Sequence, residues 1–174
     1  GADAFGRFQK EKELDIAHGL PNGVRLRINC HFERGNMAIA ARIIPTEIPS
    51  LDDVDLTDIA TQIVGLREGL ILFTGPTGSG KSTSLAALLQ SINASRAENV
   101  ITLEDPIEFL FPKGKGVIRQ RQYMEDFLSF PEAMKRILRQ DPNIIMVGEM
   151  RDPETIAAAL TLAETGHLVL ATLH

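Results

Sequence analysis

The stretch that decides the fold runs from Leu70 to Leu89 and reads LILFTGPTGSGKSTSLAALL. Its apolar opening, Leu70–Thr74, predicts a buried strand, and its alanine- and leucine-rich end predicts a helix. Between them, residues 75–82 satisfy the pattern G-x-x-x-x-G-K-[ST] of a phosphate-binding loop. A glycine-rich turn that merely connects two elements is the alternative. The strand before the motif and the helix after it favour the phosphate-binding loop.

Each residue type in this loop has a chemical reason. Glycines let backbone N–H groups approach phosphate oxygens, and the following helix points its positive end at the same anion. We expect Lys81 to reach the β- and γ-phosphates of ATP, the Ser82 hydroxyl to bind Mg²⁺, and Thr83 to contact the α-phosphate. The expected nucleotide-binding residues are Gly75, Pro76, Thr77, Gly78, Ser79, Gly80, Lys81, Ser82 and Thr83.

Short apolar runs alternate with longer amphipathic segments throughout the second part of the chain. The expected strands are Leu70–Thr74, Val100–Leu103, Ile144–Val147 and Leu168–Thr172, and the expected helices are Ser82–Asn93, Phe130–Arg139 and Pro153–Glu164. This alternation predicts an α/β fold with a mostly parallel sheet covered by helices.

The first part of the chain has a different pattern. From Val24 to Phe32, apolar residues alternate with polar ones, as expected of a half-buried strand. A turn signal separates this strand from a second one, Met37–Ile44, and the period-two pattern begins as early as Glu13. We therefore expect an antiparallel meander of about three strands. Residues 1–12 show no clear periodicity and are expected to be a frayed start.

Two prolines, Pro45 and Pro49, indicate a linker, because each biases the preceding residue away from helix. Ser50 is then expected to cap a helix that runs to about Val64. The expected organisation has three segments. They are residues 1–46 as the end of an N-terminal domain, residues 47–68 as linker and helix, and residues 69–174 as the α/β core.

The composition is that of a packed globular chain. Of 174 residues, 44% are hydrophobic and 24% are charged, the formal net charge is -5, and aromatic residues make up 5%. The negative charge argues against broad binding of nucleic-acid phosphates, and the low aromatic content argues against base stacking. No apolar run approaches the roughly 20 residues that cross a bilayer, so a soluble protein is expected. The single cysteine, Cys30, excludes an internal disulfide and fits the cytoplasm.

Another apolar strand, within Asn143–Glu149, ends in an acid and has the form of a Walker B segment. Many P-loop enzymes hold Mg²⁺ through water with an aspartate at the penultimate position, which is Gly148 here. Glu149 is therefore the candidate to serve the metal through water, to polarise the attacking water, or both. The alternative is a strand-end acid that pairs with Arg151.

Three acids, Glu104, Asp105 and Glu108, follow the predicted strand that ends at Leu103. Such a cluster positions a water molecule or a metal ion near the γ-phosphate, or it is a solvated turn. The residue types do not separate the three acids.

Histidines and arginines complete the candidates. A lone histidine is more often structural than catalytic, and arginines on a strand are usually a solvated sheet face. The alternative for the arginines is that they stabilise phosphate charge across a subunit boundary, as arginine fingers do. The residues concerned are His167, His174, Arg25, Arg27, Arg34 and Arg42.

Four segments, taken together and in this order, resemble the secretion ATPases of type II secretion systems and type IV pili. They are GPTGSGKST at 75–83, ITLEDPIEF at 101–109, DPNIIMVGEMRD at 141–152 and AETGHLVLATLH at 163–174. The sequences of these segments are most similar to those of the pilus-retraction enzymes. The resemblance implies a RecA-like P-loop NTPase core, and the arginine-rich meander resembles the end of the family's PAS-like N-terminal domain.

The resemblance also implies roles for single residues. Glu108 corresponds to the functional glutamate of the family's Asp box, and Glu149 corresponds to the Walker B glutamate, which is the catalytic base. His167 and His174 correspond to the histidines of the His box, which sense or contact nucleotide. The region that supplies arginines to the nucleotide contains Arg25, Arg27 and Arg42.

Family members are homohexameric rings that hydrolyse ATP with Mg²⁺ and pass motion to an inner-membrane platform protein. The resemblance therefore implies a cytoplasmic motor for type IV pilus retraction, peripheral at the inner membrane through its partners. Three alternatives stay open: a pilus-assembly or type II secretion motor, a RecA-like nucleic-acid motor, and a regulatory module without turnover. The chain is expected to be a fragment, because it begins inside the N-terminal domain and ends before the family's C-terminal helices.

Overall fold

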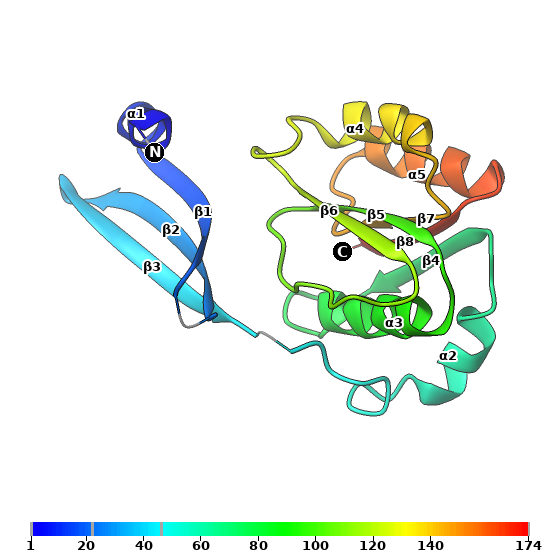
Figure 1. Cartoon of the computed structure of the whole chain (residues 1–174). Helices are drawn as coiled ribbons and strands as arrows, with labels where there is room; N and C mark the ends of the chain where they lie inside the picture. Colours follow the sequence, from blue (N-terminus) through cyan, green and yellow to red (C-terminus); the bar gives the residue numbers. More distant parts are fainter. Residues whose placement is uncertain (1, 22, 46, 174) are drawn as a thin grey trace. The chain divides into compact units, whose positions relative to one another are not determined.

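The computed structural model describes residues 2–21, 23–45 and 47–173. The chain divides into two compact units, Gly1–Glu47 and Ile48–His174, whose elements are labelled in Figure 1. Each unit is built around a β-sheet of its own.

The first unit contains helix α1 (Ala2–Glu11) and strands β1 (Glu13–Gly19), β2 (Arg25–Glu33) and β3 (Asn36–Ile44). The strands form one antiparallel sheet in the order β1-β2-β3. The predicted meander is therefore confirmed.

The prediction of a frayed start is wrong, because α1 packs on the sheet. Phe8 is buried, and its ring stacks on Phe32 of β2 with 4.9 Å between centroids. Arg7 and Glu11 add an i,i+4 ion pair at 3.9 Å. A helix of this length is marginal alone, so the aromatic contact with the sheet stabilises it.

The second unit contains helices α2 (Thr57–Ile63), α3 (Lys81–Ser95), α4 (Phe130–Ile137) and α5 (Pro153–Glu164), with a 3₁₀ turn at Leu138–Gln140. Its strands are β4 (Gly69–Thr74), β5 (Asn99–Glu104), β6 (Val117–Gln122), β7 (Ile144–Val147) and β8 (Leu168–Leu173). All neighbouring strands are parallel, in the order β4-β8-β7-β5-β6. The predicted α/β fold with a mostly parallel sheet is confirmed.

Two elements differ from the prediction. The helix expected from Ser50 begins only at Thr57, because Ser50 and Asp53 close a turn through reciprocal hydrogen bonds and Asp55 then adopts φ +53°. A positive φ ends any helix that begins at this turn. Strand β6 is absent from the predicted elements, because its sequence VIRQRQ is mostly polar and lacks an apolar run.

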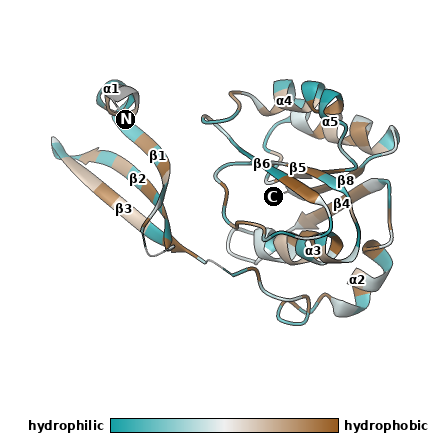
Figure 2. Cartoon of the chain, viewed as in Figure 1, coloured by the Kyte–Doolittle hydropathy of each residue, from teal (hydrophilic) through white to brown (hydrophobic). Residues whose placement is uncertain are grey.

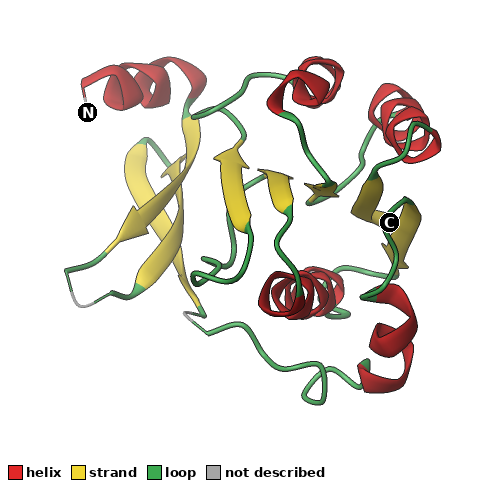
Figure 3. Ribbon diagram, turned by 45° about the vertical axis from the view of Figure 1, so that its right-hand side comes forward, coloured by secondary structure: helices red, strands yellow, loops and turns green. Residues whose placement is uncertain are grey.

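Helices cover both faces of the parallel sheet (Figure 3). One buried cluster joins Leu85, Leu88 and Leu89 of α3 to Ile144 and Leu168 of the central strands. A second cluster lies on the opposite face and contains residues of α4 and α5 together with Ile101, Ile145 and Val169. Figure 2 shows how hydrophobic and hydrophilic residues are distributed over these elements. Burial on both faces explains why the central strands read as continuous apolar runs.

The parallel order has one consequence for function. The carboxyl ends of β4, β7, β5 and β8 meet at one edge of the sheet, and open α/β sheets bind ligands at this edge.

Within residues 2–21, 23–45 and 47–173, the helices are all too short or too polar for a bilayer crossing.

Candidate nucleotide-binding site

The loop after β4 has the backbone conformation that its glycines predict. Gly75, Gly78 and Gly80 have φ values of +147°, +81° and +90°. A Cβ atom at Gly75 would lie 2.9 Å from the Ser79 hydroxyl oxygen, so the Ser79 side chain would have to move to make room for it. The Ser79 N–H donates to the Pro76 carbonyl oxygen at 3.2 Å and closes the turn. The loop is a cradle of backbone whose positive φ values favour glycine at these positions.

Lys81 lies at the mouth of this cradle. Its ammonium donates to the carbonyl oxygens of Gly75 at 2.7 Å and Pro76 at 3.2 Å. The side chain is half-buried, and two carbonyl groups of the loop hold its charge over the loop. A cation at this position favours an anionic group in the cradle.

Helix α3 begins directly at this loop. Gly80 occupies the N-cap in a left-handed conformation, and among the described residues no side chain caps the helix and no acid lies in its first turn. The first N–H groups of a helix have no intrahelical partners, and the helix dipole adds positive potential. Ser82, in the first turn, is exposed at the same place. Phosphate oxygens fit this arrangement.

The end of β7 lies against both neighbouring strands. The Gly148 N–H donates to the Leu103 carbonyl oxygen of β5 at 2.8 Å, and the Thr172 hydroxyl of β8 donates to the Gly148 carbonyl oxygen at 2.5 Å. A Cβ atom at Gly148 would lie 3.3 Å from the Leu103 carbonyl oxygen and 3.4 Å from Glu104 Cα. The aspartate that many P-loop enzymes carry here has little room, because β5 approaches so closely.

Glu149 follows at once, and its side chain is 23% exposed. Both sequence-based alternatives for this residue have support in the geometry. It lies at the strand edge that the phosphate loop also occupies, and its Oε2 accepts from Arg151 Nε at 2.6 Å. Arg151 Nη1 also donates to Asp105 Oδ2 at 3.0 Å, so it bridges acids from β7 and β5. This bridge to Asp105 is not among the sequence-based predictions, because it depends on strand order.

The three acids at the end of β5 and after it differ in burial and in hydrogen-bond partners. Glu104 is buried, and its Oε1 accepts from the Thr102 hydroxyl at 2.6 Å and from Gln120 Nε2 at 3.0 Å. Burial raises the pKa of Glu104, against these hydrogen bonds and one from the Glu108 backbone. Asp105 is partly exposed and pairs with Arg151. Glu104 is thus a structural acid, and Gln120 is its unpredicted partner from β6.

Glu108, the acid singled out by the family resemblance, is half-buried beside Glu104. The preceding backbone N–H, that of Ile107, donates to Gln122 Oε1 at 3.2 Å. The loop after β5 is therefore held by glutamines of β6. The role of Glu108 toward nucleotide stays a prediction.

A cavity of about 290 Å³ opens beside the bridged acids. Asp105, Glu149 and Arg151 line it together with Tyr123 and Phe130. The two aromatic rings lie 5.6 Å apart between centroids and form its apolar wall. The cavity thus places charged groups of the strand edge against aromatic side chains.

His167 lies at the opposite edge of the sheet. It precedes β8, and the register pairs Gly69 with Leu168 at one end and Thr74 with Leu173 at the other. Roughly 20 Å of strand therefore separates it from the phosphate loop along the sheet, at about 3.3 Å per residue. Its Nδ1 lies 3.1 Å from the Leu162 carbonyl oxygen. The second unit does not bring His167 to the loop, and its predicted contact with nucleotide stays a prediction.

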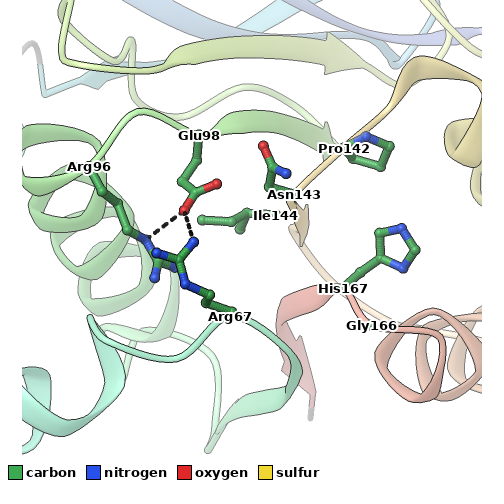
Figure 4. A pocket seen from close by; sticks show the side chains of 8 residues that line it. All are labelled: Arg67, Arg96, Glu98, Pro142, Asn143, Ile144, Gly166 and His167. Atoms are coloured by element: carbon green, nitrogen blue, oxygen red, sulfur yellow. Dashed lines mark hydrogen bonds and ion pairs between the residues drawn. The ribbon is translucent and has the colours of Figure 1, made fainter.

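The surroundings of His167 form a separate cavity of about 240 Å³ (Figure 4). Glu98 forms ion pairs there with Arg96 at 3.2 Å and with Arg67 at 3.5 Å, and Asn143 and Gly166 also line the cavity. The dashed lines in Figure 4 mark the two ion pairs. These contacts join the segment before β4 to the segment between α3 and β5.

The other predicted residues are His174 and four arginines. His174 lies outside the described residues. Arg25, Arg27 and Arg42 belong to the first unit, where Arg27 and Arg42 are directly paired across β2 and β3 and Arg25 shares their face. Arg34 lies in the turn between these strands, with φ +51°. The three sheet arginines form one basic face, and their role toward phosphate stays a prediction.

Carboxylate clusters for a metal ion are lacking in the described ranges: no group of three or more histidine, cysteine, aspartate or glutamate side chains could hold one. Mg²⁺ in phosphate-transfer sites is usually held by few protein ligands together with substrate phosphates. The exposed Ser82 hydroxyl beside the cradle suits that kind of site. Glu149, across the same strand edge, is the second predicted ligand.

Comparisons with known proteins agree with this geometry. The family model described as "Type II/IV secretion system protein" matches residues 38–174. The twitching motility protein of Neisseria gonorrhoeae is 46% identical over 167 residues, which cover 96% of this chain and 45% of that protein. The type IV pilus retraction ATPase PilT of Pseudomonas aeruginosa is 42% identical over 167 residues, covering 96% of this chain and 48% of that protein.

Among solved structures, the crystal structure of the pilus retraction motor PilT with bound ADP is similar to the whole chain. The TM-score is 0.96 at 42% identity, with 100% of this chain and 51% of that chain covered. The chain thus spans about half the length of the relatives it matches.

Proposed function

We propose the following function for this chain, which belongs to the type II/IV secretion system protein family. The whole protein is an ATPase, and this chain carries its phosphate-binding loop and its hydrolytic glutamate. One observation carries the proposal. The glycine cradle of residues 75–80, closed by Lys81, lies at the same sheet edge as Glu149.

Different residues of the second unit bind the phosphates, hold the metal ion and orient the attacking water. The loop N–H groups, the start of α3 and the Lys81 ammonium bind the triphosphate and hold it in place. Ser82 and Glu149 are the residues that would hold Mg²⁺, which supplies charge neutralisation to the phosphates when bound. The Glu149 carboxylate orients the attacking water and accepts its proton. Glu108 supports the position of this water from the loop after β5.

The work that hydrolysis drives is retraction of a type IV pilus. The support comes from the relatives that match 96% of the chain, which are named for twitching motility and pilus retraction. We further propose that the protein works as a homohexamer and acts on an inner-membrane platform protein. The basic face of Arg25, Arg27 and Arg42 then serves nucleotide bound to a neighbouring subunit.

The test of this function uses a strain that lacks the gene. Loss of a retraction motor leaves pili on the cell surface and abolishes twitching. The wild-type gene restores twitching and the Lys81→Ala variant does not. A strain that twitches normally without the gene contradicts the proposal.

A motor for pilus assembly or type II secretion is the second candidate, because the matching family includes type II secretion proteins. The same strain separates the two. Loss of surface pili, or loss of secreted proteins with twitching intact, favours the second candidate.

A further inference from the structure

Arg151 joins two acids that come from neighbouring strands. It donates from Nε to Glu149 and from Nη1 to Asp105, at 2.6 and 3.0 Å. We propose that Arg151 is a positioning residue for hydrolysis, which fixes the Glu149 carboxylate by tying it to Asp105. The inference rests on the proposed role of Glu149 and deepens it.

The strand register explains why such a tie is needed. Leu103 of β5 is level with Val147 of β7, and the two acids follow these residues by two positions each. Neighbouring strands lie about 4.8 Å apart. Two carboxylates at adjacent strand ends repel each other, and a guanidinium that bonds to both offsets that repulsion and sets their direction.

The backbone at this place does not depend on Arg151. The Gly148 N–H and Met150 N–H bond to β5 and β8 at 2.8 and 3.0 Å. Helix α5 begins through its own cap, in which the Thr155 N–H donates to Asp152 Oδ1 at 2.8 Å. The Arg151 side chain is 60% exposed, and exposed ion pairs contribute little to stability. Removal of the Arg151 side chain therefore changes the positions of the two carboxylates and leaves the strands in place.

The adjoining cavity gives the carboxylate room to turn. It has a volume of about 290 Å³ and is lined by Glu149 and Asp105 as well as Arg151. Without the guanidinium, the Glu149 carboxylate loses the bond that ties it to Asp105. A catalytic group misplaced by about 1 Å costs on the order of 100-fold in rate. Binding of the triphosphate, by contrast, depends on the loop and Lys81.

The experiment measures kcat and nucleotide affinity separately in the whole protein. We expect Arg151→Ala to lower kcat by about 10- to 100-fold. The affinity for a fluorescent ATP analogue should stay within about twofold of the wild type, since Arg151 lies outside the cradle. Arg151→Lys should rescue only part of kcat, because one ammonium lacks the forked geometry that bridges two acids. Asp105→Asn should lower kcat less, in the same direction.

Arg136→Ala is the matched control. Arg136 is an exposed arginine in an ion pair, with Glu132 at 3.4 Å on α4, away from the strand edge. It should leave kcat and affinity unchanged. Thermal unfolding of each variant checks that it is folded. If Arg151→Ala does not fold, the kcat values of Arg151→Lys and Asp105→Asn test the inference instead.

Testing Arg151→Ala in a Glu149→Gln protein distinguishes this inference from the proposed function. If Arg151 acts through Glu149, Arg151→Ala causes no further loss in a Glu149→Gln protein. Full activity of Glu149→Gln alone overturns the role of Glu149 itself. An inactive Glu149→Gln beside an Arg151→Ala protein with wild-type or raised kcat overturns the positioning role only. A parallel loss of nucleotide affinity in Arg151→Ala also overturns it.

Discussion

The Lys81 ammonium lies 2.7 Å from the carbonyl oxygen of Gly75, six residues earlier in the chain. This contact folds the lysine back over the loop that it follows, and it places the only cation of the loop at the mouth of the cradle. The sequence pattern specifies the two residue types, and the contact explains why they occur at this spacing.

The first prediction concerns this lysine. Replacement of Lys81 by Ala should weaken binding of a fluorescent ATP analogue by about 10- to 100-fold, because a charge-assisted hydrogen bond is lost. Equilibrium titration measures this change. Lys81→Arg keeps the charge and should bind more tightly than Lys81→Ala. Unaltered affinity of the alanine variant would count against the assignment of the loop.

The second prediction concerns the glycine before the candidate base. Gly148→Ala should lower the free energy of unfolding by about 1–3 kcal/mol, because the new methyl group presses on fixed backbone of β5. The nearest atom is the Leu103 carbonyl oxygen at 3.3 Å. Urea unfolding measures the change. Gly65→Ala is the control, since its Cβ would meet nothing closer than 4.0 Å, and equal effects of both variants would refute the steric account.

The third prediction concerns the buried acid Glu104. Burial raises its pKa in the folded state above the ordinary value of 4.5. Between these two pKa values the unfolded chain is ionised while the folded chain holds the proton, so stability falls as pH rises through that window. Glu104→Gln removes this proton uptake. Urea unfolding at several pH values from 4.5 upward should give a flatter profile for the variant, and parallel profiles would contradict the account.

The fourth prediction concerns the start of α5. The Thr155 hydroxyl and N–H both donate to the Asp152 carboxylate, and these bonds lower its pKa. Asp152→Ala should cost about 0.5–2 kcal/mol of stability, whereas Asp152→Asn should cost less because asparagine also caps helices. The contribution of the charge is present above the ordinary pKa and is lost as pH falls through the lowered one. Thermal unfolding of both variants checks this, and an alanine variant as stable as the wild type would refute it.

Local patterns predicted much of this fold. The strand before residue 75 and the helix that begins at Pro153 each depend on neighbours in sequence, and the structure confirms them. The prediction of a helix from Ser50 is wrong for a local reason as well. A capping residue closes a turn as readily as it starts a helix.

Contacts between distant strands were beyond prediction from one sequence. Glu104, Asp105 and Glu108 have similar side chains, and the arrangement of β5 with β6 and β7 gives them different surroundings. Gln120 and Arg151 gain their roles from the same pairing, at separations of 16 and 46 residues. The position of His167 also depends on the arrangement of the strands, because strand direction decides which end of the sheet a residue occupies.

The most direct measurement is a crystal structure of the whole protein with a non-hydrolysable ATP analogue. The account predicts density for the β- and γ-phosphates within hydrogen-bond distance of Lys81 Nζ and of the N–H groups at the start of α3. Nucleotide density at any other place, with the glycine cradle empty, would contradict it.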